Sequence, residues 1–182
     1  MGCRRVFFAL TAAQDAALTA TRDDAEVRAF VHAVAFVHAV AFVHAVAFVH
    51  AVEAAWDDEW LCETDKAWDA MHRCLGDGTL DIAYRDGGPL PLTVLGGRRH
   101  HEGEEYVVAL VLAADVVKVA EALRTVDETW LRDRYHRIDP DDHQGVLDAD
   151  DFEHTWSYLQ DVRDFYQRAA AAGSSVIFTV DQ

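Results

Sequence analysis

Residues 30 to 52 hold four consecutive copies of the hexapeptide Phe-Val-His-Ala-Val-Ala, the last of which ends at Glu53 instead of alanine. The segment has no Asp, Glu, Lys or Arg, so it must be covered by something other than water. A repeat of six residues is compatible with a strand, one coil of a β-solenoid, a membrane span or a helix. Each of these makes a different geometric prediction.

Three of the four readings meet a physical objection. A strand of this length would reach roughly 75 Å, far beyond ordinary strands. A β-solenoid needs about 18 residues for each coil, and a lone coil cannot bury its face. A membrane span would place four histidines at the depth of the hydrocarbon core, and acidic residues flank both ends of the segment.

Helical phase favours the fourth reading. Three extra copies add 18 residues, which make about five whole turns, so the insertion would not rotate one end of a helix against the other. Without them, Val27, Phe30, Val31 and Val34 fall at i, i+3, i+4 and i+7 and Trp56 falls at i+11. We therefore predict one unusually long helix from about residue 22 to 56, with residues 30–52 as an insertion that extends it.

Such a helix would be roughly 50 Å long, and its inserted part would be apolar on all sides because successive copies face different directions. We expect it to bury itself against another copy of the chain, as a dimer or a bundle. The residues expected to mediate this self-association are Phe30, Val31, Phe36, Val37, Phe42, Val43, Phe48 and Val49.

The repeat also supplies four histidines, His32, His38, His44 and His50. Within one helix they cannot chelate a metal ion, because neighbours six residues apart point about 120° from one another. Between chains they could form a metal site, although interface histidines more often pack or form hydrogen bonds.

The remainder of the chain predicts a single α+β domain over residues 1–182, with a small mixed or antiparallel sheet packed against several helices. The expected strands, 5–10, 106–112 and 175–180, lie near both termini and in the middle of the chain, and a short fourth strand is expected at 92–95 in a Gly- and Pro-rich loop. The expected helices begin at a capping box formed by Thr11 and Gln14, at 21–24, and at Thr64, and others cover 113–126, 127–135 and 148–172. Gly76 and Gly173 are the expected helix stops.

Composition limits the partners. The chain has 32 acidic against 16 basic residues, a formal net charge of −16, which repels phosphate backbones and anionic lipids. We therefore expect no nucleic acid and no membrane as a partner, whereas a basic protein partner is compatible with this charge. Cys3, Cys62 and Cys74 show no CxxC spacing, and the first residues show no secretory signal, so we expect a cytoplasmic protein with free thiols.

One helical segment gathers polar side chains of the kind used in acid–base chemistry. Asp65, Lys66, Trp68, Asp69 and His72 lie on neighbouring turns, so a carboxylate and an imidazole could meet there. Acidic residues at a helix start and a packed histidine explain the same pattern without any activity.

Two other polar segments are weaker candidates for a functional site. His100, His101 and Glu102 are expected in a solvated loop, as at most an adventitious metal site. Residues 139–150 superficially follow a calcium loop, but His143 stands at the fifth position and Gly145 is one place late, which excludes an EF-hand. No phosphate loop, GxSxG or HExxH motif is present, and we expect no cofactor.

Several short segments together resemble the YfbM-like family of small bacterial proteins. They are Met1-Gly2-Cys3, Asp65-Lys66-Ala67-Trp68 with His72, Leu95-Gly96-Gly97, Phe165-Tyr166 and Val176-Ile177-Phe178. The resemblance implies a single α+β domain outside the repeat, and it brings no activity, cofactor or catalytic residue.

Two functional hypotheses remain. The first is a non-enzymatic interaction protein whose repeat helix drives self-association. The second is a metal-binding or hydrolytic domain that uses His72 with Asp65 or Asp69, or repeat histidines from two chains.

Overall fold

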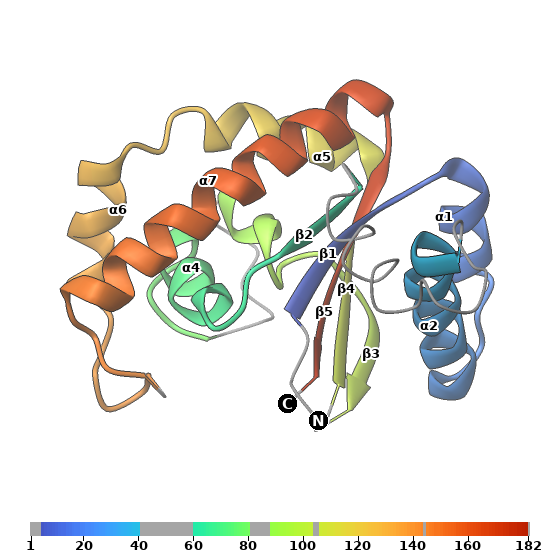
Figure 1. Cartoon of the computed structure of the whole chain (residues 1–182), viewed down its shortest axis with the longest axis horizontal. Coiled ribbons are helices and arrows are strands. Elements are labelled where there is room, and N and C mark those ends of the chain that lie inside the picture. The colour runs from blue at the N-terminus through green and yellow to red at the C-terminus, as the bar shows by residue number, and fades with distance from the viewer. Residues whose placement is uncertain (1–4, 41–59, 81–87, 104–105, 144, 182) are drawn as a thin grey trace.

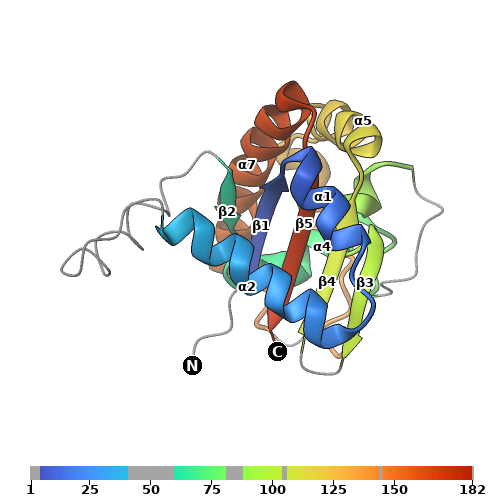
Figure 2. The same ribbon diagram turned by 90° about the vertical axis from the view of Figure 1, so that its right-hand side faces the viewer.

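The computed structural model describes residues 5–40, 60–80, 88–103, 106–143 and 145–181. In this part of the chain the structure is a three-layer α+β domain, in which one sheet lies between two groups of helices (Figures 1 and 2). None of the helices formed by the described residues combines the length and the apolar character needed to cross a membrane.

The sheet has five antiparallel strands in the order β2-β1-β5-β4-β3. Their bounds are β1 Arg5–Leu10, β2 Leu61–Glu63, β3 Arg98–Gly103, β4 Tyr106–Val111 and β5 Ser175–Asp181. The strands nearest the two termini therefore pair with each other, with Phe7 opposite Phe178. The predicted α+β class with strands near both ends of the chain is confirmed.

Alternating side chains divide the sheet residues between two cores, as the pleat of a strand requires. Phe7 and Ala9 face one core, whereas Val6, Phe8 and Leu10 face the other. Because both faces are covered by helices, β1 reads as a continuous apolar run rather than an alternating one.

The larger core lies under four helices, α4 Ala67–Leu75, α5 Ala113–Leu123, α6 Glu128–Tyr135 and α7 Ala149–Ala172. Aromatic rings join α7 to the sheet: the ring of Phe7 lies 5.9 Å from that of Phe165 and 4.6 Å from that of Phe178. The buried hydroxyl of Tyr166 donates a hydrogen bond of 2.7 Å to the carbonyl of Thr93. These contacts fix α7, whose first turn borders the candidate site.

The smaller core lies under α1 (Ala12–Thr19) and α2 (Asp24–Val40). The predicted capping box is present, since the side chain of Thr11 accepts from the Gln14 amide and Gln14 accepts from the Thr11 amide. In α2, Val27, Val31 and Val34 are buried against the sheet, as the periodicity predicts. The predicted continuation of this helix to residue 56 lies outside the described residues.

Three local predictions were wrong. Residues 92–95 do not form a strand, because Leu90–Thr93 is a 3₁₀ turn (η1) whose Pro91 has no amide to donate to a sheet. Residues 100–102 are part of the edge strand β3 rather than a loop. The polar sequence of β3 suits a strand that pairs on one side only.

The third error concerns the segment 61–66, where the short strand β2 was missed and the helix start was placed too early. Thr64 continues the pairing of β2, because its amide and its hydroxyl both donate to the carbonyl of Arg5. Asp65 then has a φ of 43°, which is not helical, and α4 begins only at Ala67.

Candidate functional site

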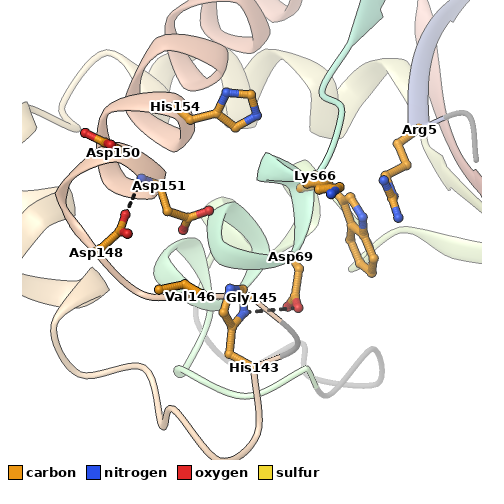
Figure 3. Close-up of a pocket in the computed structure, with 11 residues that line it drawn as sticks. Arg5, Lys66, Asp69, His143, Gly145, Val146, Asp148, Asp150, Asp151 and His154 are labelled. Carbon is orange, nitrogen blue, oxygen red and sulfur yellow. Dashed lines mark hydrogen bonds and ion pairs between the residues drawn. The ribbon is translucent and has the colours of Figure 1, made fainter.

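A cleft of about 840 Å³ opens where the first turns of α4 and α7 approach the loop that precedes α7 (Figure 3). Carboxylate, imidazole and cationic side chains from four chain segments line it together with one indole. The lining residues are Arg5, Lys66, Trp68, Asp69, His143, Gly145, Val146, Asp148, Asp150, Asp151 and His154.

A buried guanidinium lies behind the cleft. Arg73 is only 2% exposed, and its Nε donates to Oδ1 of Asp69 at 2.7 Å. Its two terminal nitrogens donate to Oδ2 and to the main-chain oxygen of Asp142, at 2.6 and 2.8 Å. Hydrogen bonds to both carboxylates raise the pKa of Arg73 against the opposing effect of its burial. Arg73 therefore ties the loop before α7 to α4.

Asp69 shares its carboxylate between that guanidinium and an imidazole. Its second oxygen lies 3.2 Å from Nδ1 of His143, and the two side chains are only 13% and 6% exposed. The pair lacks the alignment of a hydrogen bond, so Nδ1 of His143 is a buried polar atom without a hydrogen-bond partner in the described part of the chain. In Figure 3 both side chains lie at the base of the cleft.

A second carboxylate–imidazole pair lies near the mouth of the cleft. Nε2 of His154, on α7, is 3.5 Å from Oδ2 of Asp65. Asp65 adopts the left-handed backbone conformation that Asp tolerates better than most residues, and such conformations cluster at functional sites.

The first turn of α7 contributes three carboxylates. Asp148 caps the helix by accepting from the Asp151 amide at 2.9 Å, and Asp151 accepts from the hydroxyl of Tyr135 at 2.5 Å. Burial, and then this hydrogen bond, raise the pKa of Tyr135. Asp150 is exposed and makes no hydrogen bond or ion pair with any described residue.

The facing wall is cationic, as Figure 3 shows with Arg5 and Lys66 opposite the three aspartates of α7. Lys66 is exposed, and the side chain of neither cation bonds to another described residue. The Nε atom of Arg5 is buried without a hydrogen-bond acceptor.

The predicted polar site is partly brought together by the structure. Lys66, Trp68 and Asp69 line the cleft, and Asp65 is paired with a lining residue. His72, in contrast, is buried on α4 and is not among the lining residues.

The sequence interpretation missed several residues that shape this site, among them Arg73, His143 and His154. The spacing of Asp69 and Arg73, four residues apart on a helix, was a readable signal for their ion pair. His143 was set aside with the rejected calcium loop, and only tertiary structure places it beside α4.

The residues predicted for self-association are only partly described. Phe30 and Val31 pack on the chain's own sheet. The helix α2 also contains Phe36, Val37, His32 and His38, whose side chains the structure does not describe. Phe42, Val43, Phe48, Val49, His44 and His50 lie outside the described residues altogether.

Within the described ranges, no three side chains of His, Cys, Asp or Glu come together in a way that could hold a metal ion. His100 is half-buried on β3, and its burial, assisted by the charge of Arg98, lowers its pKa.

Comparisons with known proteins agree on the fold. The family described as a domain of unknown function, DUF1877, matches residues 1–179. The crystal structure of YfbM from Escherichia coli, a protein of unknown function, superposes with a TM-score of 0.62 at 14% identity, over 97% of this chain and 99% of that one. No curated protein matches the chain.

Proposed function

The chain belongs to the DUF1877 family of YfbM-like proteins, whose function is unknown, and from this premise we propose that it is a non-enzymatic binding module with its ligand site in the α4–α7 cleft. The supporting observation is that the buried Arg73–Asp69 ion pair lies behind the cleft, while Arg5, Lys66 and Asp150 on its walls have no side-chain partner among the described residues. Its volume falls in the range of about 300–1,000 Å³ that small-molecule sites occupy.

Two features of the lining favour binding over catalysis. The described lining residues include no serine, threonine or cysteine that could act as a nucleophile. The Asp69–His143 pair resembles a base with its orienting carboxylate, but the imidazole is only 6% exposed, which limits its access to a substrate. A Cβ at position 145 would lie only 2.7 Å from Nε2 of His143, so only glycine fits beside this imidazole. A hydrolytic role through His72 is disfavoured by its burial away from the cleft.

The binding role is tested by closing the cleft without disturbing the core. Val146 is 74% exposed and lines the cleft, so Val146→Trp would fill its mouth. Val117, on α5 and 42% exposed, is not among the lining residues, so Val117→Trp is the matched control. A panel of single amino acids, amines, carboxylates and phosphate esters is titrated while the indole signal of Trp68 and the imidazole signals of His143 and His154 are followed by NMR.

We expect at least one compound to shift these signals in the wild type and in Val117→Trp, and to lose its effect in Val146→Trp. Shifts that persist in Val146→Trp would place the binding elsewhere on the protein. The absence of shifts with every compound would refute the proposal.

Self-association through the repeat helix is a second proposed role. It is supported by the observation that the apolar side of the first copy, residues 30–35, is already buried against the chain's own sheet through Val31 and Val34. In a continuous helix six residues would turn by about 600°, so the following copies would not all fall on that side. A second copy of the chain is the partner that offers the same apolar surface in return.

Deletion of residues 35–52 tests this role, because it removes 18 residues, or about five turns, and leaves the flanking helix in phase. We expect sedimentation velocity to show an oligomer for the wild type at pH 8 and a monomer for the deletion. At pH 5 protonated histidines should weaken the wild-type assembly. A wild type that is monomeric at both pH values would end the idea, and metal lost together with the repeat would favour interchain histidine ligands.

A further inference from the structure

Some charged residues of the cleft form hydrogen bonds or ion pairs with other described residues, whereas others do not. Asp69 and His143 are paired with each other, and Asp69 also holds Arg73. Asp148 and Asp151 serve the helix cap and Tyr135, and His154 is paired with Asp65.

Three charged lining residues remain without a partner among the described residues. Arg5 and Lys66 are on one wall, and Asp150 is on the opposite wall (Figure 3). A buried donor without an acceptor is costly, and the Nε atom of Arg5 is such a donor. Because that atom is buried, an anionic group at this wall would instead contact the terminal guanidinium nitrogens of Arg5 and the ammonium of Lys66 through charge-assisted hydrogen bonds.

The opposite wall is acidic and lacks a cationic partner for Asp150 among the described residues. Asp150 can accept hydrogen bonds only, as an ionised carboxylate, so its natural counterpart is a cationic donor. The neighbouring carboxylates Asp148 and Asp151 deepen the negative potential at this end of the cleft. Their own hydrogen bonds keep them in place, so a cation meets a wall that is already organised.

We propose that the cleft binds a small dipolar molecule, with its carboxylate at Arg5 and Lys66 and its primary ammonium at Asp150. This inference rests on the cleft being a ligand site, and it adds the chemical class of the ligand. A ligand with both charges gains two sets of charge-assisted hydrogen bonds, whereas a ligand with one charge leaves the other wall unsatisfied. The buried Asp69–His143 pair between the walls gives the middle of the ligand a rigid base.

Three six-carbon probes separate the two charges. 6-Aminohexanoate carries both, hexylamine carries only the ammonium and hexanoate carries only the carboxylate. We expect 6-aminohexanoate to shift the Trp68, His143 and His154 signals of the full chain, and each single-charge probe to bind at least about tenfold more weakly, the equivalent of one lost charged contact. Glycine and 4-aminobutanoate extend the series to shorter spans.

Substitutions at the two walls provide the second arm. Lys66→Gln and Asp150→Asn should each weaken 6-aminohexanoate binding about tenfold, because each removes the partner of one charge. Lys118→Gln on α5 and Glu153→Gln on α7 are the matched controls, since they remove the same charges from exposed positions outside the lining. All four positions are exposed, so the variants should fold like the wild type.

The outcomes are distinguishable. If hexylamine or hexanoate binds as tightly as 6-aminohexanoate, or if the wall variants match their controls, the dipolar ligand is refuted while the cleft remains a binding site. If none of the dipolar probes binds but other compounds shift the cleft signals and lose their effect in Val146→Trp, the ligand class is also refuted. The proposed function is refuted as well if every compound fails to bind, or if the shifts persist in Val146→Trp.

Discussion

Asp69 is the side chain on which the candidate site most depends, because one carboxylate serves both Arg73 and His143. Asp69→Asn would leave the buried guanidinium of Arg73 with Asp142 as its one carboxylate partner. Because Asp142 remains, the buried charge of Arg73 is only partly uncompensated, and the cost should lie below the roughly 3–5 kcal/mol of breaking a buried pair outright. We expect the free energy of unfolding in urea to fall by about 2–3 kcal/mol.

The control for this prediction is Asp115→Asn, which breaks an exposed pair with Lys118. Such pairs contribute at most about 1 kcal/mol, so the control should be nearly neutral. Equal losses for the two variants would show that the network around Arg73 adds no more stability than a surface pair.

The buried thiols give a prediction about pH. Burial raises the pKa of Cys62 and of Cys74 to about 12, whereas a thiol in an unfolded chain titrates near pH 8.5. Between these values the unfolded chain holds fewer protons than the native one, so stability falls as the pH rises through this window and does not depend on these thiols below it.

Two measurements check the thiols, both in a Cys3→Ser background. Ellman's reagent at pH 8 should react with neither thiol of the native protein and with both after unfolding. Urea denaturation should show a lower free energy of unfolding at pH 9.5 than at pH 8. Rapid labelling of the native protein would mean that the two side chains are accessible, contrary to their burial.

At the level of single residues, the sequence predicted helical caps and core positions well, because these depend on near neighbours. Thr11 caps α1 as predicted, and the helices expected at 127–135 and 148–172 are capped by the acidic residues at their starts, Asp127 and Asp148. It predicted the members of the cleft poorly, since His143 meets Asp69 only through a contact between residues 74 positions apart in the chain. The partnership assigned to His72 belongs to His143 for this reason.

At the level of elements, the C-terminal end of α7 allows the cost of a left-handed backbone conformation to be measured without any steric clash. Gly173 has a φ of 66°, and a Cβ at this position would meet nothing within 4 Å. Gly173→Ala should therefore lower the free energy of unfolding by about 1 kcal/mol through conformation alone. Gly173→Asn should cost less, because Asn adopts the left-handed conformation more readily. Equal costs for Ala and Asn would show that the effect is not conformational.

The elements also show where sequence patterns stop being informative. α5 and α7 were predicted from apolar periodicity, which their burial confirms at Val116, Val119 and Leu159. The edge strands β2 and β3 were not predicted, because a strand that pairs on one side can be short or polar and so carries little periodic signal. The need for glycine at position 97 also depends on a contact between distant parts of the chain. A Cβ there would lie 2.4 Å from the carbonyl oxygen of Leu110, so only glycine lets this backbone lie so close to β4.

At the level of the whole molecule, two forces oppose each other in any contact between copies of the chain. The net charge of −16 repels a second copy, and this repulsion is screened over about 10 Å at 0.1 M salt. Apolar contacts through the repeat, in contrast, do not weaken with salt. A basic partner or a dipolar cleft ligand, held by charge, should bind less tightly as salt rises.

Salt dependence therefore gives the last prediction. Sedimentation velocity in 20 mM and 500 mM NaCl at pH 8 should show tighter self-association of the wild type at the higher salt, because repulsion is screened while the apolar contact persists. Deletion of residues 35–52 is a closely matched control, since these residues include no Asp, Glu, Lys or Arg and the net charge of −16 is unchanged. The deleted protein should remain monomeric at both salt concentrations. If it associates in high salt as the wild type does, the contact lies on another surface, and screening rather than the repeat explains the assembly.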